Sequence, residues 1–391
     1  MSGAAPVTVT INLAERVWFV RNNAGAGQGN DQAPFQTLAQ AETASDVNDT
    51  IFVYSGDLAT TGQDVGITLK SGQKLIGEGV GLSLNGVVIV PAATAPKISN
   101  AALIAPANIP VVMLATGNEV AGLAIEASSN EAILALSGTG HNLHNNTITF
   151  GAGGREGIRL LGNVTGNVLI SNNTITGALR DGIKVTNNEA LDGANVAPTP
   201  MVATVTMNGN TIKNSAQDGI RGSLNDVVAG STSVTLIVQT NTIENSGTAG
   251  ADEGINIDSF GSARVTAGIS GNTISISSAE AIDLSADGNS IMSAEVSGNR
   301  LANSQGVSDF LAQLTAGSTG SMCLELFNNV NTTLPPPLPP LSTFTVNNNA
   351  GVVILLFEGV NEIKNDTAVD RNAGVGGIDN VLQGACNIPA L

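Results

Sequence analysis

Charged residues recur at two fixed places beside a repeated glycine in the middle of the chain. An acidic residue directly precedes this glycine, or the alanine that once replaces it, at Glu156, Asp181, Asp218, Glu253 and Glu280. The second residue after the glycine is basic in three copies and then polar or acidic: Arg159, Lys184, Arg221, Asn256 and Asp283. Two carboxylates about 5 Å apart repel by roughly 3 to 4 kcal/mol at an effective dielectric constant of 20. If the copies stack, a buried acidic column therefore requires Ca²⁺ or basic side chains beside it. The sequence favours the alternative of solvent-facing turn residues with weak ion pairs.

The element that must position these residues is a repeat marked by Asn-Thr-Ile. Its asparagines, counting one Asn-Arg-Leu variant, are Asn146, Asn173, Asn210, Asn241, Asn272 and Asn299, which are 27, 37, 31, 31 and 27 residues apart. Each copy holds two short alternating runs separated by a polar break, such as VLISNNTI followed by GIKV, which is typical of short strands. None contains a stretch with helical periodicity, so repeats of paired helices are excluded, and the spacing of leucine-rich repeats is absent.

Such a unit cannot bury its apolar side alone, but stacked copies can, which predicts a parallel β-helix with strands about 4.8 Å apart. The predicted inner column is Ile148, Ile175, Ile212, Ile243, Ile274 and Leu301. We expect the repeated asparagines to form a structural ladder of side-chain amides at a turn, where asparagine also tolerates a left-handed backbone. We expect the repeated glycine to free the backbone where it enters a strand.

The two ends of the coil need protection, since an uncapped rung exposes backbone donors and acceptors. Residues 1–60 are expected to form an N-terminal cap, with strands at 17–20 and 49–57 and a short helix in PFQTLAQAETAS. Residues 61–320 are expected to form the coils, including GVVIVPAA and AALIAPA as early ones. Residues 321–391 would close the molecule, with an extended Pro-rich loop at 335–340. Cys323 and Cys386 are either an extracellular disulfide that fastens this segment or two buried thiols.

Composition limits the classes of partner. The net charge is -17, which argues against nucleic acid or an anionic lipid surface. No apolar run is long enough to span a bilayer, and the first residues lack the pattern of a signal peptide, so we expect any export signal to lie outside this chain. Aromatic residues make up only 3% of the chain, so stacking platforms for sugars are scarce.

The segment VWFVRNNAGAGQGNDQAPFQTLAQAETASDVNDTIFVYSGD, then GITLKSGQKLIGEGV and the Asn-Thr-Ile coils, resembles the right-handed parallel β-helix modules of large secreted or surface-exposed bacterial proteins, in the pectate-lyase-like superfamily. The resemblance covers about residues 16 to 305. It is specific for the fold and not for an activity, because the superfamily holds lyases, hydrolases, tailspikes, adhesins and modules without known chemistry.

The resemblance implies one catalytic alternative. In a polysaccharide lyase of this kind, Asp181, Asp218 and Glu253 would hold Ca²⁺, while Lys184 or Arg221 would abstract the proton α to a uronate carboxylate. The catalytic patterns of polygalacturonases and pectate lyases are missing, apart from a faint likeness in RDGIKV. No catalytic residue is therefore carried over from either family.

The sequence thus predicts an all-β protein, a single-stranded right-handed parallel β-helix roughly 60 Å long with a short N-terminal capping helix. We expect a non-catalytic, extracellular or cell-surface structural or adhesive module, with carbohydrate or a host or cell-surface component as partner. The alternative is a lyase or depolymerase that acts on acidic glycans with Ca²⁺, so enzymatic activity stays open. Self-association through the coil ends is a third possibility.

Overall fold

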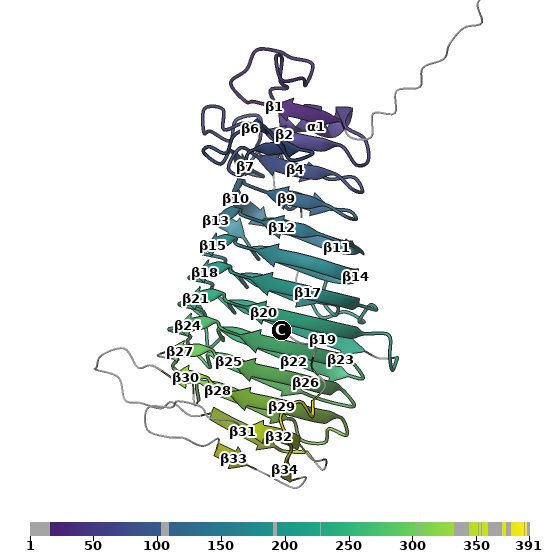
Figure 1. Ribbon diagram of the computed structural model, residues 1–391, viewed down its shortest axis with the longest axis vertical. Helices are drawn as coiled ribbons and strands as arrows, with labels where there is room; N and C mark the ends of the chain where they lie inside the picture. The colour runs from purple at the N-terminus through teal and green to yellow at the C-terminus, as the bar shows by residue number, and fades with distance from the viewer. Residues whose placement is uncertain are drawn as a thin grey trace, which may run out of the picture.

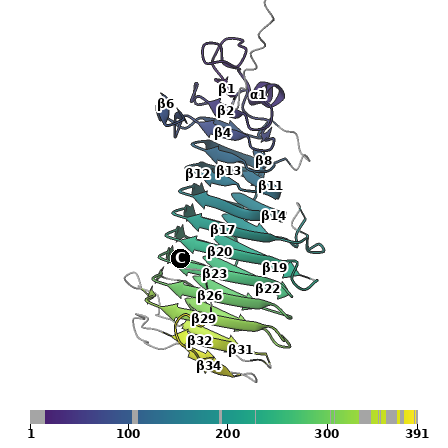
Figure 2. The ribbon, with the colours of Figure 1, turned by 45° about the vertical axis from the view of Figure 1, so that its right-hand side comes forward.

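The structure is a computed structural model that describes residues 16–388, with gaps at 103–108, 191–193, 227, 303, 307, 332–343, 351, 353, 359–369, 373–376 and 387. The chain winds into one long right-handed parallel β-helix, which confirms the predicted fold class (Figure 1). Successive rungs lie side by side along the long axis, and a 45° turn of the molecule shows the same stack (Figure 2). Residues far apart in sequence are therefore neighbours at equivalent places on adjacent rungs.

Each rung contributes strands to three faces, and every pairing within a face is parallel. The first face consists of β3 (Ile67–Thr68), β8 (Val112–Leu114), β11 (Ile133–Thr139), the start of β14 (Ile158–Ser171), β16 (Ile183–Thr186), β19 (Ile220–Asp226), β22 (Ile255–Gly261), β25 (Ile282–Ala286), β28 (Phe310–Leu314), β31 (Phe344–Asn348) and β33 (Asp370–Asn372).

The second face consists of β1 (Val17–Val20), β2 (Thr50–Val53), β4 (Lys74–Gly77), β9 (Glu119–Ala121), β12 (Asn142–His144), the end of β14, β17 (Val202–Asn208), β20 (Ser233–Gln239), β23 (Arg264–Ser270), β26 (Ile291–Ser297), β29 (Ser321–Phe327), β32 (Ile354–Glu358) and β34 (Ile378–Asn380). The third face consists of β7 (Lys97–Ser99), β10 (Ala124–Asn130), β13 (Thr147–Gly154), β15 (Thr174–Thr176), β18 (Thr211–Lys213), β21 (Thr242–Glu244), β24 (Thr273–Ser275), β27 (Arg300–Ala302) and β30 (Val330–Asn331).

The core is a set of aliphatic columns that run along the axis. The predicted column from Ile148 to Leu301 lies on the third face, where its members pair in register and are fully buried. Burying one such side chain stabilises the fold by about 1.5 to 3 kcal/mol. The repeat therefore stabilises the coil through one residue type at one place.

The asparagine ladder is present and longer than predicted. The Nδ2 of each asparagine donates to the Oδ1 of the next one, at 2.9 to 3.0 Å, from Asn146 through Asn299 to Asn329. Each Nδ2 also donates to a carbonyl of the preceding rung, as Asn210 does to Ile170 at 2.9 Å. The left-handed residue is the one before the ladder asparagine, as at Asn145 and Asn172, so that part of the prediction is wrong.

The repeated glycine has a different role from the one predicted. A Cβ on Gly219 would lie 2.4 Å from the Ile243 side chain and 2.6 Å from the Gly254 carbonyl oxygen, and Gly182 and Gly254 are in the same position. None of the three has a positive φ. Glycine is thus required because the next rung approaches closely, and not because the backbone needs an unusual conformation.

Strands β1 and β2 and a short helix lie where the sequence predicted two strands and a helix, although β2 ends at Val53 and not at 57. Helix α1 (Leu38–Ala44) begins at a capping box, in which Thr37 accepts from the Gln40 backbone and Gln40 accepts from the Thr37 backbone. Its Leu38 and Ala41 are buried in the main core at the end of the stack (Figure 1). The cap therefore covers the apolar interior of the first rungs.

One early coil was predicted wrongly. GVVIVPAA holds β6 (Val87–Val90), which pairs antiparallel with β5 (Leu82–Leu84) in a hairpin beside the stack. Asn85 and Gly86 form its turn, and both have positive φ. Positive φ at both central residues is typical of the type I′ turn that is favoured in two-residue hairpins. Most of AALIAPA lies outside the described residues.

The C-terminal segment adds rungs, and its disulfide is formed. Cys323 in β29 is bonded to Cys386, with Cα atoms 5.4 Å apart, which decides between the two alternatives that the sequence left open. The carboxylate of Glu325 accepts the backbone N–H groups of Gly384 and Cys386, each at 3.0 Å. The Pro-rich loop at 335–340 lies outside the described residues.

Candidate functional site

The two charged columns predicted from the repeat lie on and beside the first face. The strand pairings place Arg159, Lys184, Arg221, Asn256 and Asp283 side by side on successive rungs. The acidic column stands at the turn just before these strands. Stacking therefore brings together five segments of the chain that span more than a hundred residues.

Four of the five residues of the acidic column are buried and Glu253 is half-buried, whereas the sequence favoured a solvent-facing column. Glu156, Asp181 and Asp218 have no exposed surface. The Asp181 carboxylate accepts the backbone N–H of Asp218 at 3.1 Å, and the Asp218 carboxylate accepts that of Glu253 at 2.7 Å. These carboxylates thus tie consecutive rungs together. Burial is the main cause that raises the pKa of Asp218 well above its usual range, and the nearby charge of Asp181 raises this pKa further.

The N-terminal part of the site is a closed ion-pair network. Arg159 is fully buried and contacts Glu131 at 2.9 Å and Glu189 at 3.1 Å. Lys184 contacts Asp181 at 3.1 Å and Glu189 at 3.0 Å, and its side chain is only 5% exposed. Because its ammonium group is committed to two carboxylates under cover, Lys184 offers no open position for a substrate proton.

Arg221 is the most exposed of the three basic residues in this column. Its side chain is 27% exposed and contacts Asp218 at 3.3 Å and Asp258 at 3.5 Å. Burial lowers the pKa of its guanidinium, but Asp218 and other carboxylates outweigh burial, so that the pKa lies above its ordinary value. The structure therefore favours a charged anchor at this position over the base that the resemblance implied.

Two carboxylates on the rungs after Arg221 have raised pKa values. Burial raises the pKa of Asp258 to about 6, although Arg221 opposes the effect. Burial also raises the pKa of Asp283 to about 8, and the charges of Glu253, Asp258 and Glu280 contribute. The two residues are diagonal neighbours on adjacent strands, since Asn256 pairs with Asp283 and Asp258 pairs with Ser285. Two carboxyl groups with separated pKa values thus face the same part of the surface.

Hydrogen-bond acceptors remain unused beside this pair. Asn256 is 8% exposed, and its Nδ2 donates to Glu253 at 3.0 Å. Within the described residues, its Oδ1 and the Oδ1 of Asp283 have no hydrogen-bond partner. Buried oxygens of this kind are costly unless a ligand, a proton or a water satisfies them. The β22 and β25 rungs therefore offer free acceptors to a hydrogen-bond donor.

The predicted Ca²⁺ ligands are only partly grouped. Among the described residues, Asp218, Asp252 and Glu253 have ligand atoms within 4.8 Å of one another, and Asp181 is not in the group. Carboxylate oxygens are the ligands that Ca²⁺ prefers. The fit is incomplete, because both oxygens of Asp218 already accept hydrogen bonds, from Glu253 and Arg221.

Sequence reasoning missed four members of the site, one of which, Asp252, directly precedes Glu253 outside the repeated pattern. Glu131 precedes Ala-Ile just as Glu280 does, so the pattern of the acidic column would have found it. Asp258 lies two residues beyond Asn256 on the same strand, and an alternating pattern places it on the same outward face. Glu189 lies in the variable segment after β16, where no repeat indicates its position.

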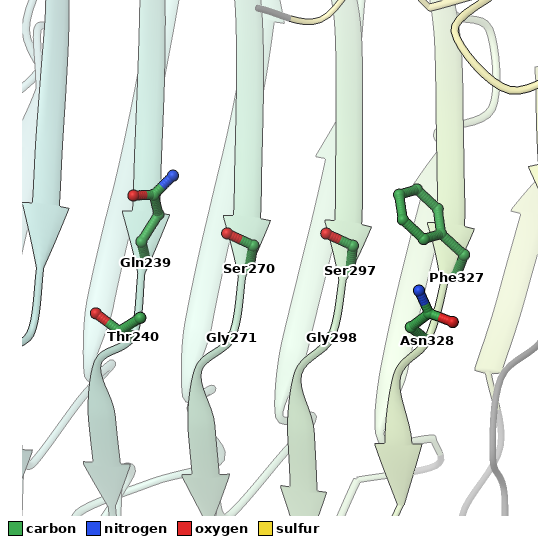
Figure 3. Close-up of a pocket in the computed structure, with 8 residues that line it drawn as sticks. All are labelled: Gln239, Thr240, Ser270, Gly271, Ser297, Gly298, Phe327 and Asn328. Carbon is green, nitrogen blue, oxygen red and sulfur yellow. The ribbon is translucent and has the colours of Figure 1, made fainter. Parts of the chain in front are cut away.

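A shallow pocket lies elsewhere, where the second face turns into the third. Side chains from the ends of β20, β23, β26 and β29 stand in a row there, with glycines in the middle of the turn below (Figure 3). The lining residues are Gln239, Thr240, Ser270, Gly271, Ser297, Gly298, Phe327 and Asn328. None is charged, so this pocket offers no acid or base.

The fold and the site define a parallel β-helix protein with a carboxylate-rich first face. No family model matches the chain, and no curated protein matches it. Solved structures similar to it include the GH136 lacto-N-biosidase from Eubacterium ramulus, with a TM-score of 0.46 and 11% identity over 94% of this chain and 68% of that one.

Two further solved structures are similar at lower scores. The A-module of the Azotobacter vinelandii mannuronan C-5 epimerase AlgE4 has a TM-score of 0.39 and 12% identity over 86% of this chain and 91% of that one. A rhamnogalacturonan lyase has a TM-score of 0.35 and 12% identity over 94% and 90%. All three TM-scores are below 0.5, so the function must be argued from the residues of this chain.

Proposed function

We propose that this protein is a glycan depolymerase that cleaves glycosidic bonds by acid–base catalysis on the first face. The observation that carries the proposal is the pair Asp258 and Asp283, whose pKa values of about 6 and about 8 lie on either side of neutrality. Carboxyl groups whose surroundings separate their pKa values are typical of acid–base pairs. Both are partly accessible, and the site holds unused acceptors beside them.

The two residues would divide the proton transfers between them. Near pH 7, Asp283 is mostly protonated and donates its proton to the glycosidic oxygen as the bond from that oxygen to the anomeric carbon breaks. Asp258 is mostly ionised and takes a proton from the water whose oxygen bonds to the anomeric carbon. The sum is the addition of one water across the glycosidic bond. Arg221, at 3.5 Å, helps to keep Asp258 ionised.

The substrate class comes from two sources. The resemblance to pectate-lyase-like β-helices implies a glycan. The charge around the site favours a neutral one, because the carboxylates Asp252, Glu253 and Asp258 lie near one another and near a single described cation, Arg221. A uronate carboxylate would meet net repulsion there.

Burial of the acidic column is what favours an enzyme over the non-catalytic module that the sequence favoured. A solvent-facing column would be an ordinary solvated surface, whereas buried carboxyl groups with raised pKa values cost stability and need a reason. The Cys323–Cys386 disulfide supports an oxidising, extracellular location. Across the described residues, no helix is long and apolar enough to cross a membrane.

A second candidate is Ca²⁺-dependent action on acidic glycans, and the group Asp218, Asp252 and Glu253 favours it. A bound Ca²⁺ would neutralise the local negative charge and allow a uronate to approach. Its prediction differs from that of the first candidate: cleavage of polygalacturonate that requires Ca²⁺ and yields unsaturated, ultraviolet-absorbing products.

The test is to incubate the protein with a panel of neutral polysaccharides and to measure cleavage by the release of reducing ends. We expect a bell-shaped pH profile that rises near pH 6 and falls near pH 8, and a loss of 10²-fold or more in Asp283→Asn and in Asp258→Asn. Glu244→Gln, an exposed acid on the third face, is the matched control and should keep full activity. If neither the neutral polysaccharides nor polygalacturonate with Ca²⁺ is cleaved, the proposal is wrong and the structural module stands.

A further inference from the structure

The hairpin of β5 and β6 forms one side of a pocket on the N-terminal rungs. The hairpin stands beside the stack (Figure 2). Its Leu82 is buried in a second apolar cluster with Phe52 and Ile76, which belong to strands of the second face. A pocket of about 320 Å³ lies between the hairpin and this face. Its size is within the range of small-molecule sites, which begins at roughly 300 Å³.

Part of the pocket lining is apolar. The hairpin and the residues just before it supply most of this part, and β4 supplies one more side chain: Val80, Leu82, Leu84 and Ile76. None of the lining residues between 80 and 84 is charged. This part of the pocket therefore suits an apolar body and offers no counter-ion.

The rest of the lining holds three charged residues from neighbouring strands of the second face. Lys74, Glu119 and His144 lie on β4, β9 and β12. The Nε2 of His144 lies 3.1 Å from the Glu119 carboxylate, and its Nδ1 lies 2.8 Å from the Oδ1 of Asn145. Both ring nitrogens thus face acceptors, which favours the imidazolium. The hydrogen bond with Glu119 is the main cause that raises the pKa of His144 above its ordinary value.

This arrangement leaves Lys74 available to a ligand. His144 balances the charge of Glu119, whereas the Lys74 ammonium lies 4.0 Å from that carboxylate, which is too long for a hydrogen bond. Among the described residues Lys74 makes no other ion pair, and its side chain is 40% exposed. Two cations and one carboxylate leave one positive charge at this pocket, in a chain whose net charge is -17.

We propose that this pocket binds a small carboxylate with an apolar body. The carboxylate would accept hydrogen bonds from the Lys74 ammonium, and the body would lie against Leu82 and Leu84. A hydrogen bond between two charged groups is stronger than one between neutral groups, so an anion gains most from the free ammonium. The pocket lies on the second face, apart from Asp258 and Asp283, and its ligand does not depend on the proposed catalysis.

Binding of the carboxylate should weaken as His144 loses its proton. Below the pKa of His144 the pocket is positive; above it, Glu119 and Lys74 balance each other and the net charge is zero. The other strand that lines the pocket, β2, contributes only the uncharged Thr50. For two unit charges about 6 Å apart in water, the change corresponds to about a threefold loss of affinity.

The experiment titrates benzoate, benzamide and galacturonate into the full chain at pH 6 and pH 9 and follows the imidazole signals by NMR. We expect benzoate to bind about tenfold more tightly than the other two at pH 6, and about threefold less tightly at pH 9 than at pH 6. Benzoate should raise the pKa of His144 and leave that of His141, the other histidine of the chain, unchanged. Equal binding of benzamide would overturn the role of the charge, and equal binding of galacturonate would overturn the apolar body. If none of the three binds, the proposal is wrong.

Three variants assign the effect to its residues. Lys74→Met keeps the length of the side chain, and we expect its affinity for benzoate to fall about tenfold, to that for benzamide. Lys97→Met is the matched control, because Lys97 is 43% exposed, pairs with Glu126 and lies on the third face. His144→Gln should bind benzoate equally at pH 6 and pH 9. Unchanged affinity in Lys74→Met, or a pH dependence that persists in His144→Gln, would refute the part assigned to that residue.

Discussion

Ile276 adopts a backbone conformation that equivalent rungs reserve for glycine or asparagine. Its φ is 59°, and the same place is held by Gly177, Asn214 and Asn245, each of which donates its N–H to the next rung as Ile276 does to Ala302. A left-handed conformation costs an ordinary residue about 1 to 2 kcal/mol, and more so a β-branched one. The backbone at Ile276 is therefore strained, and the surrounding rungs hold it in this conformation.

Replacing Ile276 by asparagine should therefore stabilise the protein. We expect Ile276→Asn to raise the free energy of unfolding by about 1 kcal/mol, because asparagine tolerates this backbone. The side chain would also reach the row in which Asn245 donates to Asn214 at 2.7 Å. Urea denaturation measures the change. Ile276→Val keeps the β-branch and should show no gain; an equal gain in both variants would contradict the strain.

The raised pKa of Asp283 predicts that stability falls with increasing pH. The folded protein holds this proton up to pH of about 8, whereas an unfolded aspartate loses it near pH 4. Between these values the folded state binds more protons, so the free energy of unfolding decreases as pH rises. Asp283→Asn removes this dependence. We expect its melting temperature to exceed that of the unchanged protein at pH 8.5 and to match it at pH 3.5; a higher melting temperature for the unchanged protein at pH 8.5 would count against the raised pKa.

At the scale of elements, the asparagine ladder joins successive rungs through side-chain hydrogen bonds, in addition to the pairing of their strands. Asn210 accepts from the backbone and the side chain of Asn173 and donates to the Ile170 carbonyl and to Asn241. All of these groups are buried, so removal of the amide leaves several of them without partners.

We expect Asn210→Ala to lower the free energy of unfolding by about 3 kcal/mol or more, since each unsatisfied buried group costs about 1 to 3 kcal/mol. Asn208→Ala, an exposed position on the preceding strand, should change it by less than about 0.5 kcal/mol. Chemical denaturation of both variants makes the comparison. Similar losses in the two would mean that the ladder adds little to stability.

The features that were predicted correctly from the sequence are those that recur in every copy of the repeat. The isoleucine column, the ladder and the two charged columns follow from spacing alone, because stacking converts a period into contact. The burial of the acidic column could not be predicted, since Glu189, which pairs with Arg159 and Lys184 beside it, comes from a variable loop. The hairpin of β5 and β6 was also missed, because an isolated apolar run such as VVIV reads equally well as a rung.

At the scale of the molecule, the strands of each rung pair only with those of adjacent rungs, so damage should stay local. The Cys323–Cys386 disulfide closes a loop over 63 residues, and its loss should cost about 4 kcal/mol in the chain-entropy description. In the double variant Cys323→Ser, Cys386→Ser, we expect faster hydrogen exchange in β29 to β34 and unchanged exchange in β14 to β20. Faster exchange along the whole stack would show that the coil unfolds as one unit.

The strict register of β17, β20 and β23, in which seven consecutive residues match on each strand without a shift, makes the length of this protein editable. Excision of residues 210 to 240 would join Gly209 to Asn241 and leave every remaining turn in phase with the next. The shortened protein would have one coil fewer, and Lys184 would lie beside Asn256 instead of Arg221. Deleting chosen coils would thus place new combinations of side chains next to one another along the axis.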